Sequence, residues 1–300
     1  MGKIAFVFSG QGDQYPGMGK DLAEKYPAAA SVFSACDRIR PGTSVQCFEG
    51  TEEELKETRN TQPCLYALET AAAAVLKEHG VVPDAAAGFS LGEVSAAAVC
   101  GLFDLETGFR LVCRRGELMQ HEAGKADTSM AAVLKLAPEQ GEEICGRYPD
   151  VYPVNFNCPG QVTVSGLSAR MADVAEAVKA AGGRTVPLKV KGAFHSPFMR
   201  EASAAFAEEL AGIPFRKPAV PLWSDMTAEP YPDGGAAELL SGQISSPVQW
   251  ERIIRGMIAG GIDTFIEIGP GKTLCNMIRR ISPEARAVSM TEYLAEVEAC

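Results

Sequence analysis

Short apolar segments alternate with helix-forming segments along the first part of the chain. Residues 4–8 are continuously apolar, which is typical of a strand buried on both faces of a parallel sheet. A second apolar run, residues 85–87, precedes a Gly-rich turn and a helical segment at 93–100. Further helices are predicted over about 18–26, 63–79 and 104–122. This alternation indicates an α/β fold with a largely parallel sheet.

The pattern changes near Gly124. From there the sequence predicts strand, helix, strand, strand, helix and strand, over residues 130–136, 138–148, 151–157, 161–165, 169–181 and 184–191. The order βαββαβ is typical of ferredoxin-like domains. Helices and strands then resume at about 197–211, 220–224, 248–260 and 264–268. We therefore predict a large subdomain formed by residues 1–124 and 197–300, with a small subdomain inserted over residues 125–196.

The composition excludes several classes of protein. Hydrophobic residues make up 46% of the 300 residues and charged residues 22%, as in a soluble globular chain. The net charge of −10 argues against a nucleic-acid-binding protein, which usually presents a basic face. No apolar run is long enough to span a membrane, and the N-terminal run is too short for a secretory signal.

The nine cysteines are scattered, and no two of them form a C-x-x-C pair. This usage is typical of reduced, buried thiols and not of a disulfide framework or a zinc site. We therefore expect a cytoplasmic protein without a bound metal.

Residues 88–92 read Gly-Phe-Ser-Leu-Gly, between an apolar run and a helical run. In this context Gly-x-Ser-x-Gly predicts a sharp strand-to-helix turn that exposes the hydroxyl of Ser90 as a nucleophile. The backbone N–H of the next residue and the helix N-terminus would then face the reacting group. The alternative is a Gly-rich turn in which Ser90 is an ordinary helix N-cap.

A serine nucleophile needs a base, and the chain has three histidines. His79 lies at a predicted helix C-terminus, where histidine often interacts with the helix dipole. His121 ends a polar helix and is expected to be exposed. His195 directly follows the last strand of the predicted insertion, at a junction between subdomains, which is a favoured place for a site. His195 is therefore the candidate base, with a hydrogen-bonded loop histidine as the alternative.

Two Gly-rich loops fail the nucleotide-binding patterns. The loop at 10–12 has Tyr15 where a dinucleotide fingerprint needs its last glycine, and it can instead offer a backbone N–H to an oxyanion. Residues 269–273 resemble the end of a phosphate loop, but the required first glycine falls at Ile266. We interpret the second loop as a strand-to-helix turn.

Arg114 and Arg115 are neighbours in a predicted helix. Adjacent helical residues point about 100° apart, so at most one of the pair faces a cleft. The local pattern by itself favours a solvated helix face for both.

Eight segments, in this order and spacing, resemble malonyl-CoA:acyl carrier protein transacylases. They are residues 8–12, 61–63, 88–92, 115–120, 157–161, 192–195, 246–250 and 267–271. The resemblance covers nearly the whole chain. It implies an α/β-hydrolase-like large subdomain, with a mostly parallel sheet, and an inserted ferredoxin-like small subdomain.

The resemblance also implies a role for each matching residue. Ser90 would be the nucleophile and His195 its base, oriented by the backbone carbonyl of Gln243. The backbone N–H groups of Gln11 and Leu91 would form the oxyanion hole. Arg115 would pair with the free carboxylate of a malonyl group, for which a planar guanidinium is well suited. The remaining substrate-binding positions would be Gln62, Met119, Phe194, Phe89 and Asn157.

Phe89 departs from the family, which usually has His or Gln immediately before the nucleophile. Beside Phe194 it would make the acyl pocket more apolar. Arg115 still favours a carboxylated acyl group, because a buried guanidinium without such a partner keeps unmet hydrogen bonds.

The resemblance therefore implies an acyl carrier protein S-malonyltransferase of fatty acid biosynthesis. It would act without a cofactor, as a monomer, on malonyl-CoA and acyl carrier protein. Because carrier proteins are typically acidic, we expect docking on a basic patch for which the candidates are Lys189, Lys191, Arg200, Arg279 and Arg280. The alternatives are a polyketide-pathway acyltransferase with another extender unit, an acyl hydrolase with the same Ser-His pair, and a non-enzymatic binding module.

Overall fold

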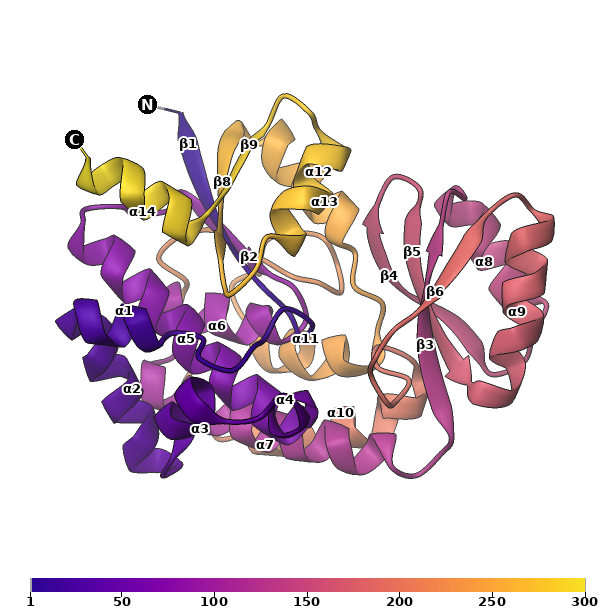
Figure 1. Cartoon of the computed structure of the whole chain (residues 1–300), viewed down its shortest axis with the longest axis horizontal. Coiled ribbons are helices and arrows are strands. Elements are labelled where there is room, and N and C mark those ends of the chain that lie inside the picture. Colours follow the sequence, from indigo (N-terminus) through magenta and orange to yellow (C-terminus); the bar gives the residue numbers. More distant parts are fainter. Residues whose placement is uncertain (1, 300) are drawn as a thin grey trace.

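The computed structural model describes residues 2–299 and has two parts, each built on its own sheet (Figure 1). The first sheet is five-stranded and the second is four-stranded. Both chain ends lie beside the first sheet, while the second sheet lies at the opposite end of the molecule.

The large sheet consists of β1 (Lys3–Phe8), β2 (Ala85–Gly88), β7 (Leu222–Trp223), β8 (Ile262–Ile268) and β9 (Arg286–Ser289), in the order β7-β2-β1-β8-β9. Every neighbouring pair is parallel, which confirms the predicted α/β class. Successive side chains of β1 enter different apolar clusters: Ala5 and Val7 join the one around Trp250, and Phe6 and Phe8 the one around Leu65. The continuous apolar run is thus explained by burial on both faces.

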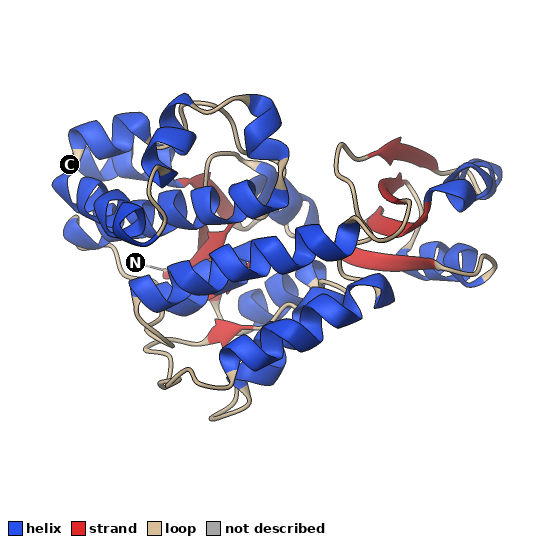
Figure 2. Ribbon diagram, turned by 90° about the horizontal axis from the view of Figure 1, so that it is seen from below, coloured by secondary structure: helices blue, strands red, loops and turns tan. Residues whose placement is uncertain are grey.

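Helices cover both faces of this sheet, as Figure 2 shows from below. They are α1 (Lys20–Lys25), α2 (Pro27–Ile39), α3 (Thr43–Glu49), α4 (Glu52–Lys56), α5 (Thr58–Glu78), α6 (Leu91–Val99), α7 (Leu105–Ala123), α10 (Arg200–Leu210), α11 (Ala236–Gly242), α12 (Trp250–Ala259), α13 (Thr273–Ile281) and α14 (Met290–Glu298), with the 3₁₀ helices η1 (Pro197–Met199) and η2 (Gln243–Ser245). Helices α12 and α13 pack in one apolar cluster, whereas α2, α5 and α7 pack in the other.

The small sheet follows the predicted order βαββαβ. Its elements are β3 (Thr128–Leu134), α8 (Pro138–Gly146), β4 (Val151–Cys158), β5 (Gln161–Leu167), α9 (Ser168–Ala180) and β6 (Arg184–Pro187). The strand order is β4-β5-β3-β6 and all pairs are antiparallel. The predicted subdomain boundaries at 124/125 and 196/197 stay a prediction.

Residues 243–248, which begin with η2, form hydrogen bonds that hold the two parts together. Val248 donates from its backbone N–H to Val154 O of β4 and accepts from the N–H of Phe156, at 2.9 Å in each case. In the same loop, Ile244 O accepts from the N–H of His195 at 3.2 Å. The segment after the small sheet is therefore fixed against the large part.

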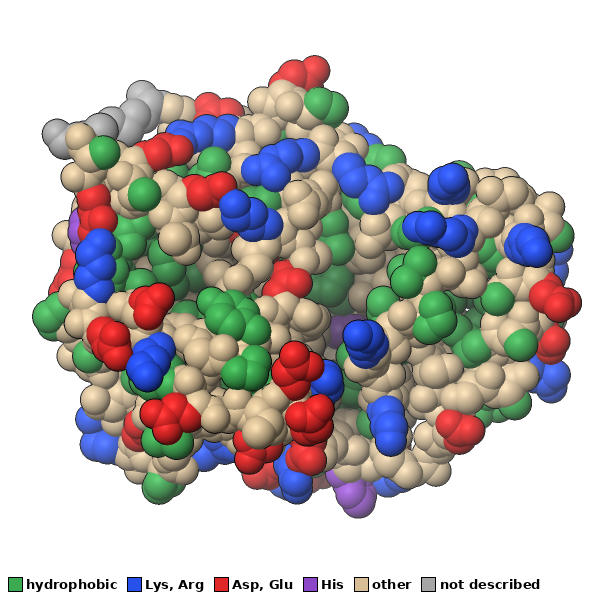
Figure 3. All heavy atoms as spheres, viewed as in Figure 1, with side chains coloured by type: hydrophobic (Ala, Val, Ile, Leu, Met, Phe, Trp, Pro, Cys, Tyr) green, Lys and Arg blue, Asp and Glu red, His purple; other side chains and the backbone are tan. Residues whose placement is uncertain are grey.

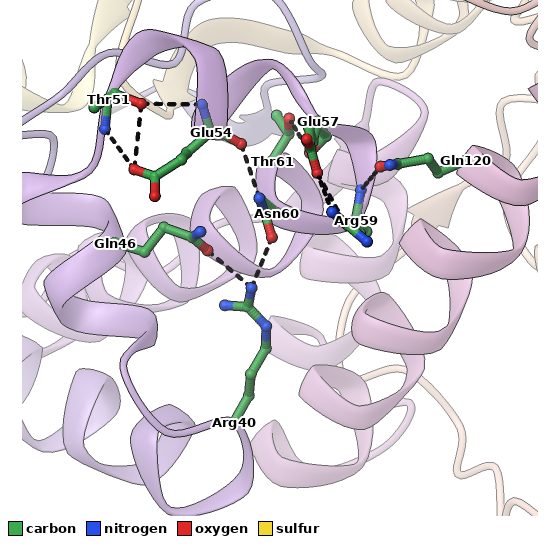
Figure 4. Close-up of polar contacts among 9 residues, drawn as sticks. All are labelled: Arg40, Gln46, Thr51, Glu54, Glu57, Arg59, Asn60, Thr61 and Gln120. Atoms are coloured by element: carbon green, nitrogen blue, oxygen red, sulfur yellow. Dashed lines mark hydrogen bonds and ion pairs between the residues drawn. The ribbon is translucent and has the colours of Figure 1, made fainter. Parts of the chain in front are cut away.

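Two predicted elements differ from the structure by four residues or more at one end. Helix α5 begins at Thr58, before Pro63, because polar groups around its first turns satisfy the free backbone groups (Figure 4). There the N–H of Arg59 donates to Gln120 Oε1 at 2.9 Å, which ties α5 to α7. Strand β6 ends at Pro187 and not at residue 191, although the N–H of Leu188 still donates to Met130 O at 2.9 Å.

No helix within residues 2–299 is long and apolar enough to cross a membrane.

We predict that Gly92→Ala destabilises the protein even though alanine is the better helix former. A Cβ at position 92, inside α6, would lie 2.3 Å from Phe8 O, so β1 or α6 must shift, at a cost of about 1–3 kcal/mol. In the matched variant Gly141→Ala, inside α8, the new Cβ meets only Val162 at 3.8 Å, and stability should rise by about 0.5–1 kcal/mol. Urea unfolding of both variants checks this; equal changes would contradict the argument.

Candidate active site

Ser90 lies on the turn between β2 and α6, at the carboxyl edge of the parallel sheet. Its backbone has φ 56° and ψ −107°, a conformation that costs energy in a non-glycine residue. Both glycines of the motif are required by space: a Cβ at Gly88 would lie 1.9 Å from the Gly92 carbonyl carbon, and a Cβ at Gly92 would meet Phe8. The predicted strand-to-helix turn is therefore present.

His195 lies against Ser90 although 105 positions separate them. Its Nε2 is 2.7 Å from Ser90 Oγ, and its Nδ1 is 2.8 Å from the carbonyl oxygen of Gln243. Because that carbonyl can only accept, Nδ1 carries the ring proton and Nε2 accepts from the serine hydroxyl. This tautomer is the one that a general base for Ser90 needs.

The pKa of His195 is lowered from 6.5 to about 4. Burial is the main cause, and the nearby charge of Arg115 acts in the same direction, while the hydrogen bond to Gln243 opposes both. The imidazole is therefore neutral at physiological pH. The contact with Ser90 distinguishes His195 from His79 at the end of α5 and from the exposed His121.

The residues Gln11 and Leu91, predicted to form the oxyanion hole, follow neighbouring strands of the sheet. Gln11 follows β1 and Leu91 is the first residue of α6, on neighbouring strands of the sheet. Within residues 2–299 neither backbone N–H donates to a protein acceptor. Free N–H groups at a helix N-terminus and an adjacent loop suit a developing oxyanion.

Arg115 is fully buried and reaches the nucleophile. It donates from Nη1 to Gln62 Oε1 at 2.8 Å, and from Nη2 to Gln243 Oε1 at 2.6 Å and Ser90 Oγ at 3.4 Å. Arg114, one residue earlier, is exposed and pairs with Glu209 and Glu117. The local pattern, which favoured a solvated face for both arginines, is thus correct for Arg114 and wrong for Arg115.

A close helix contact places Arg115. A Cβ at Gly116 would lie 3.0 Å from Thr58 O, so α7 and α5 approach closely beside the arginine. Burial lowers the pKa of Arg115 to about 10, and the carboxyl groups of Glu93 and Asp225 oppose this. The guanidinium therefore keeps its charge at neutral pH.

Gln62 and Met119 lie together with Arg115. Gln62 Nε2 is 3.3 Å from Met119 Sδ and 3.5 Å from Gln11 Oε1, and both Gln62 and Met119 are buried. The predicted arginine helix and the Gln62 segment therefore converge on the loop of Gln11.

Phe89 and Phe194 belong to different apolar clusters, and their place in an acyl pocket stays a prediction. The Phe89 ring lies edge-on to Trp250, with centroids 5.6 Å apart, in the cluster of α12 and α13. Phe194 belongs to the cluster on the other face of the sheet. An edge-to-face contact of this kind is a favourable geometry for two aromatic rings.

Two cavities meet at the loop of Gln11. One, of about 230 Å³, is lined by Gln11, Phe89 and Asn157 among others, and the second, of about 470 Å³, shares Gln11, Gly12 and Leu188 with it. Asn157 is buried and donates to Thr163 Oγ1 at 3.2 Å. These cavities open between the two parts of the molecule, where Figure 3 shows a hollow with both basic and acidic side chains beside it.

Comparison with known proteins identifies the family. The acyl transferase domain model matches residues 5–296. The chain belongs to the acyl transferase family. It is 36% identical over 299 residues to the malonyl CoA-acyl carrier protein transacylase of Bacillus subtilis strain 168, which covers 97% of this chain and 94% of the relative.

Solved structures agree with this assignment. The malonyl CoA-acyl carrier protein transacylase of Clostridium perfringens superposes with a TM-score of 0.95 and 33% identity, over 99% of this chain and 98% of the other. A malonyl-transacylase in complex with its type II polyketide acyl-carrier protein gives a TM-score of 0.95 at 32% identity, over 99% and 100% of the two chains. The predicted enzyme class and fold are confirmed.

Sequence reasoning missed a buried polar group behind Ser90 in this acyltransferase. Asp225 Oδ2 accepts from the Ser90 N–H at 2.6 Å, and Glu93 Oε2 accepts from Gln243 Nε2 at 2.9 Å. Tyr231 donates its hydroxyl to Glu93 Oε1. The Gln243 side chain therefore forms hydrogen bonds of its own with Glu93 and Arg115, although the resemblance implied a role for its backbone alone. The sequence signal for this group was Glu93, an acidic residue three positions after Ser90 in the first turn of α6.

No group of three or more His, Cys, Asp or Glu side chains within residues 2–299 is arranged to hold a metal ion.

We expect the His195 imidazole of this acyltransferase to titrate near pH 4. Since its folded-state pKa lies below the ordinary 6.5, the neutral form contributes stability above about pH 6.5, and that contribution is lost as the pH falls toward 4. In Arg115→Met the titration midpoint should rise, because a repelling charge is removed. NMR titration of the His195 ring protons in the native protein and in Arg115→Met measures both midpoints; a native midpoint at 6.5 would contradict the lowered pKa of His195.

Proposed function

We propose that this acyltransferase moves a malonyl group from malonyl-CoA to the phosphopantetheine thiol of acyl carrier protein, through an ester on Ser90. The observation that carries the proposal is a buried guanidinium, Arg115, with Nη2 only 3.4 Å from Ser90 Oγ. A cation beside the nucleophile selects an acyl group that carries its own carboxylate. The names of the relatives support the same reaction.

In the first half-reaction Ser90 Oγ attacks the thioester carbonyl of malonyl-CoA. His195 Nε2 takes the hydroxyl proton, since it already accepts that hydrogen bond at 2.7 Å. The carbonyl oxygen becomes an oxyanion, and the N–H groups of Gln11 and Leu91 donate to it. The C–S bond then breaks, and His195 returns the proton to the CoA sulfur.

In the second half-reaction the carrier thiol is the nucleophile, and the same steps run in the reverse direction. His195 takes the thiol proton, the sulfur attacks the Ser90 ester, and the proton goes back to Ser90 Oγ as the ester bond breaks. Gln243 O holds Nδ1 at 2.8 Å throughout, so the ring stays in the required tautomer. No cofactor takes part in this scheme.

Carrier protein docking is proposed on the basic candidates named from the sequence. All five side chains are exposed. Within residues 2–299, Arg279 and Arg280 donate only to neutral acceptors such as Ala287 O and Pro159 O, so neither is paired there with a carboxylate that a partner would have to displace. The pathway, fatty acid synthesis, the cytoplasmic location and the monomeric state belong to this proposal as well.

Ser90→Ala should form no acyl-enzyme with malonyl-CoA, because no oxygen remains to hold the ester. We expect kcat to fall at least about ten-thousand-fold. Intact-protein mass spectrometry after incubation with malonyl-CoA measures the adduct. Labelling of the variant at the native level would overturn the nucleophile, and native acyl-enzyme that decays equally fast without carrier protein would favour the hydrolase alternative.

Arg115→Ala should lose about 100-fold or more in kcat/KM for malonyl-CoA, since the acyl carboxylate loses a buried charged partner. Acylation by acetyl-CoA, which has no such carboxylate, should be affected far less. Arg114→Ala, on the exposed side of the same helix, is the matched control and should change neither. Equal losses for both donors in Arg115→Ala would show that the arginine is structural.

A further inference from the structure

The side-chain amide of Gln243 has one possible orientation. Its nitrogen lies 2.9 Å from the carbonyl oxygen of Ser90, which can only accept, and 2.9 Å from Glu93 Oε2. Its oxygen therefore faces Arg115 Nη2, at 2.6 Å. One amide thus connects a carboxyl group on one side with a guanidinium on the other.

Glu93 is the charged member of the buried carboxyl pair. It receives three hydrogen bonds: from Gln243, from the backbone N–H of Asp225 at 3.3 Å, and from the hydroxyl of Tyr231. Asp225 receives one, from Ser90, and its Oδ1 has no partner within the described part of the chain. Several donors favour the ionised form, so Glu93 carries the charge and Asp225 the proton. Glu93 also lies in the first turn of α6, where the helix dipole favours an anion.

Arg115 has no carboxylate in direct contact. Its partners Gln62, Gln243 and Ser90 are neutral, and its Nε has none among the described residues. A fully buried cation needs a compensating charge nearby. Glu93, one amide away, is placed to supply it.

We propose that Glu93 is the resident counter-ion of Arg115, linked to it through the Gln243 amide, and that it sets how strongly Arg115 binds the acyl carboxylate. Its charge stabilises the guanidinium in the free enzyme and weakens its attraction for malonate-like groups. Glu93 is thus a positioning and specificity residue that never touches substrate. This inference rests on the proposed function.

Glu93→Gln tests the proposal by removing the charge while keeping the shape. The new amide can accept from Gln243 and Asp225 with its oxygen and face Tyr231 with its nitrogen. KM for malonyl-CoA should fall about fivefold or more, because the guanidinium is no longer compensated. KM for acetyl-CoA should stay as in the native enzyme.

Two controls separate charge from structure. Glu69→Gln replaces another fully buried carboxyl, which accepts from Ser9 Oγ at 2.9 Å, and should leave the ratio of the two KM values unchanged. In an Arg115→Ala background, Glu93→Gln should no longer move that ratio. An unchanged ratio in Glu93→Gln, or the same shift in the Arg115→Ala background, would overturn the counter-ion role. If the native enzyme itself does not prefer malonyl-CoA over acetyl-CoA, the proposed function fails instead.

The native enzyme offers a second test should Glu93→Gln fail to fold. Burial raises the pKa of Glu93 to about 7, with Tyr231, Asp225 and Gln243 opposing by hydrogen bonds. Lowering the pH from about 8.5 to about 6 therefore neutralises the counter-ion, while His195 stays neutral and Arg115 stays charged. The ratio of KM for malonyl-CoA to KM for acetyl-CoA should fall over this range. A ratio that is constant or rises would overturn the proposal.

Discussion

A guanidinium with no exposed surface is the constraint on which the arrangement of the site depends. Arg115 cannot be buried without acceptors, so Gln62 from α5 and Gln243 from η2 must both reach it. Gln243 in turn holds His195 through its carbonyl and Glu93 through its amide. A single residue of η2, Gln243, therefore helps to bury the charge of Arg115, orients His195 and binds Glu93 of α6.

The parallel sheet brings segments that are distant in the sequence to one edge of the molecule's large part. Strands β7, β2 and β1 are neighbours, and their carboxyl ends carry Asp225, Ser90 and Gln11. The small sheet adds His195 by the segment that follows β6 and adds Asn157 from β4. The hydrogen bonds of Val248 to β4 fix this second part against the first.

The sequence predicted most of the elements with strong local patterns. The apolar strand β1, the turn at Ser90 and the order βαββαβ all appear in the structure, because each follows from periodicity and glycine placement over short stretches. Bounds were less accurate where tertiary contacts override local preference, as at the start of α5, where the N–H of Arg59 donates to Gln120 of α7. The elements that were not predicted are strand β9 and helices α2, α3, α4, α11 and α14.

The sequence by itself determined the nucleophile turn, since only glycine fits at positions 88 and 92, and motif order identified the family. Tertiary structure alone decided what each charged group does. Arg114 and Arg115 are chemically identical neighbours, and only packing of α7 on α5 buries one and exposes the other. The pairing of Glu93 with Gln243, 150 positions apart, has no local signal, because hydrogen bonds between buried polar groups depend on the folded geometry and not on sequence spacing.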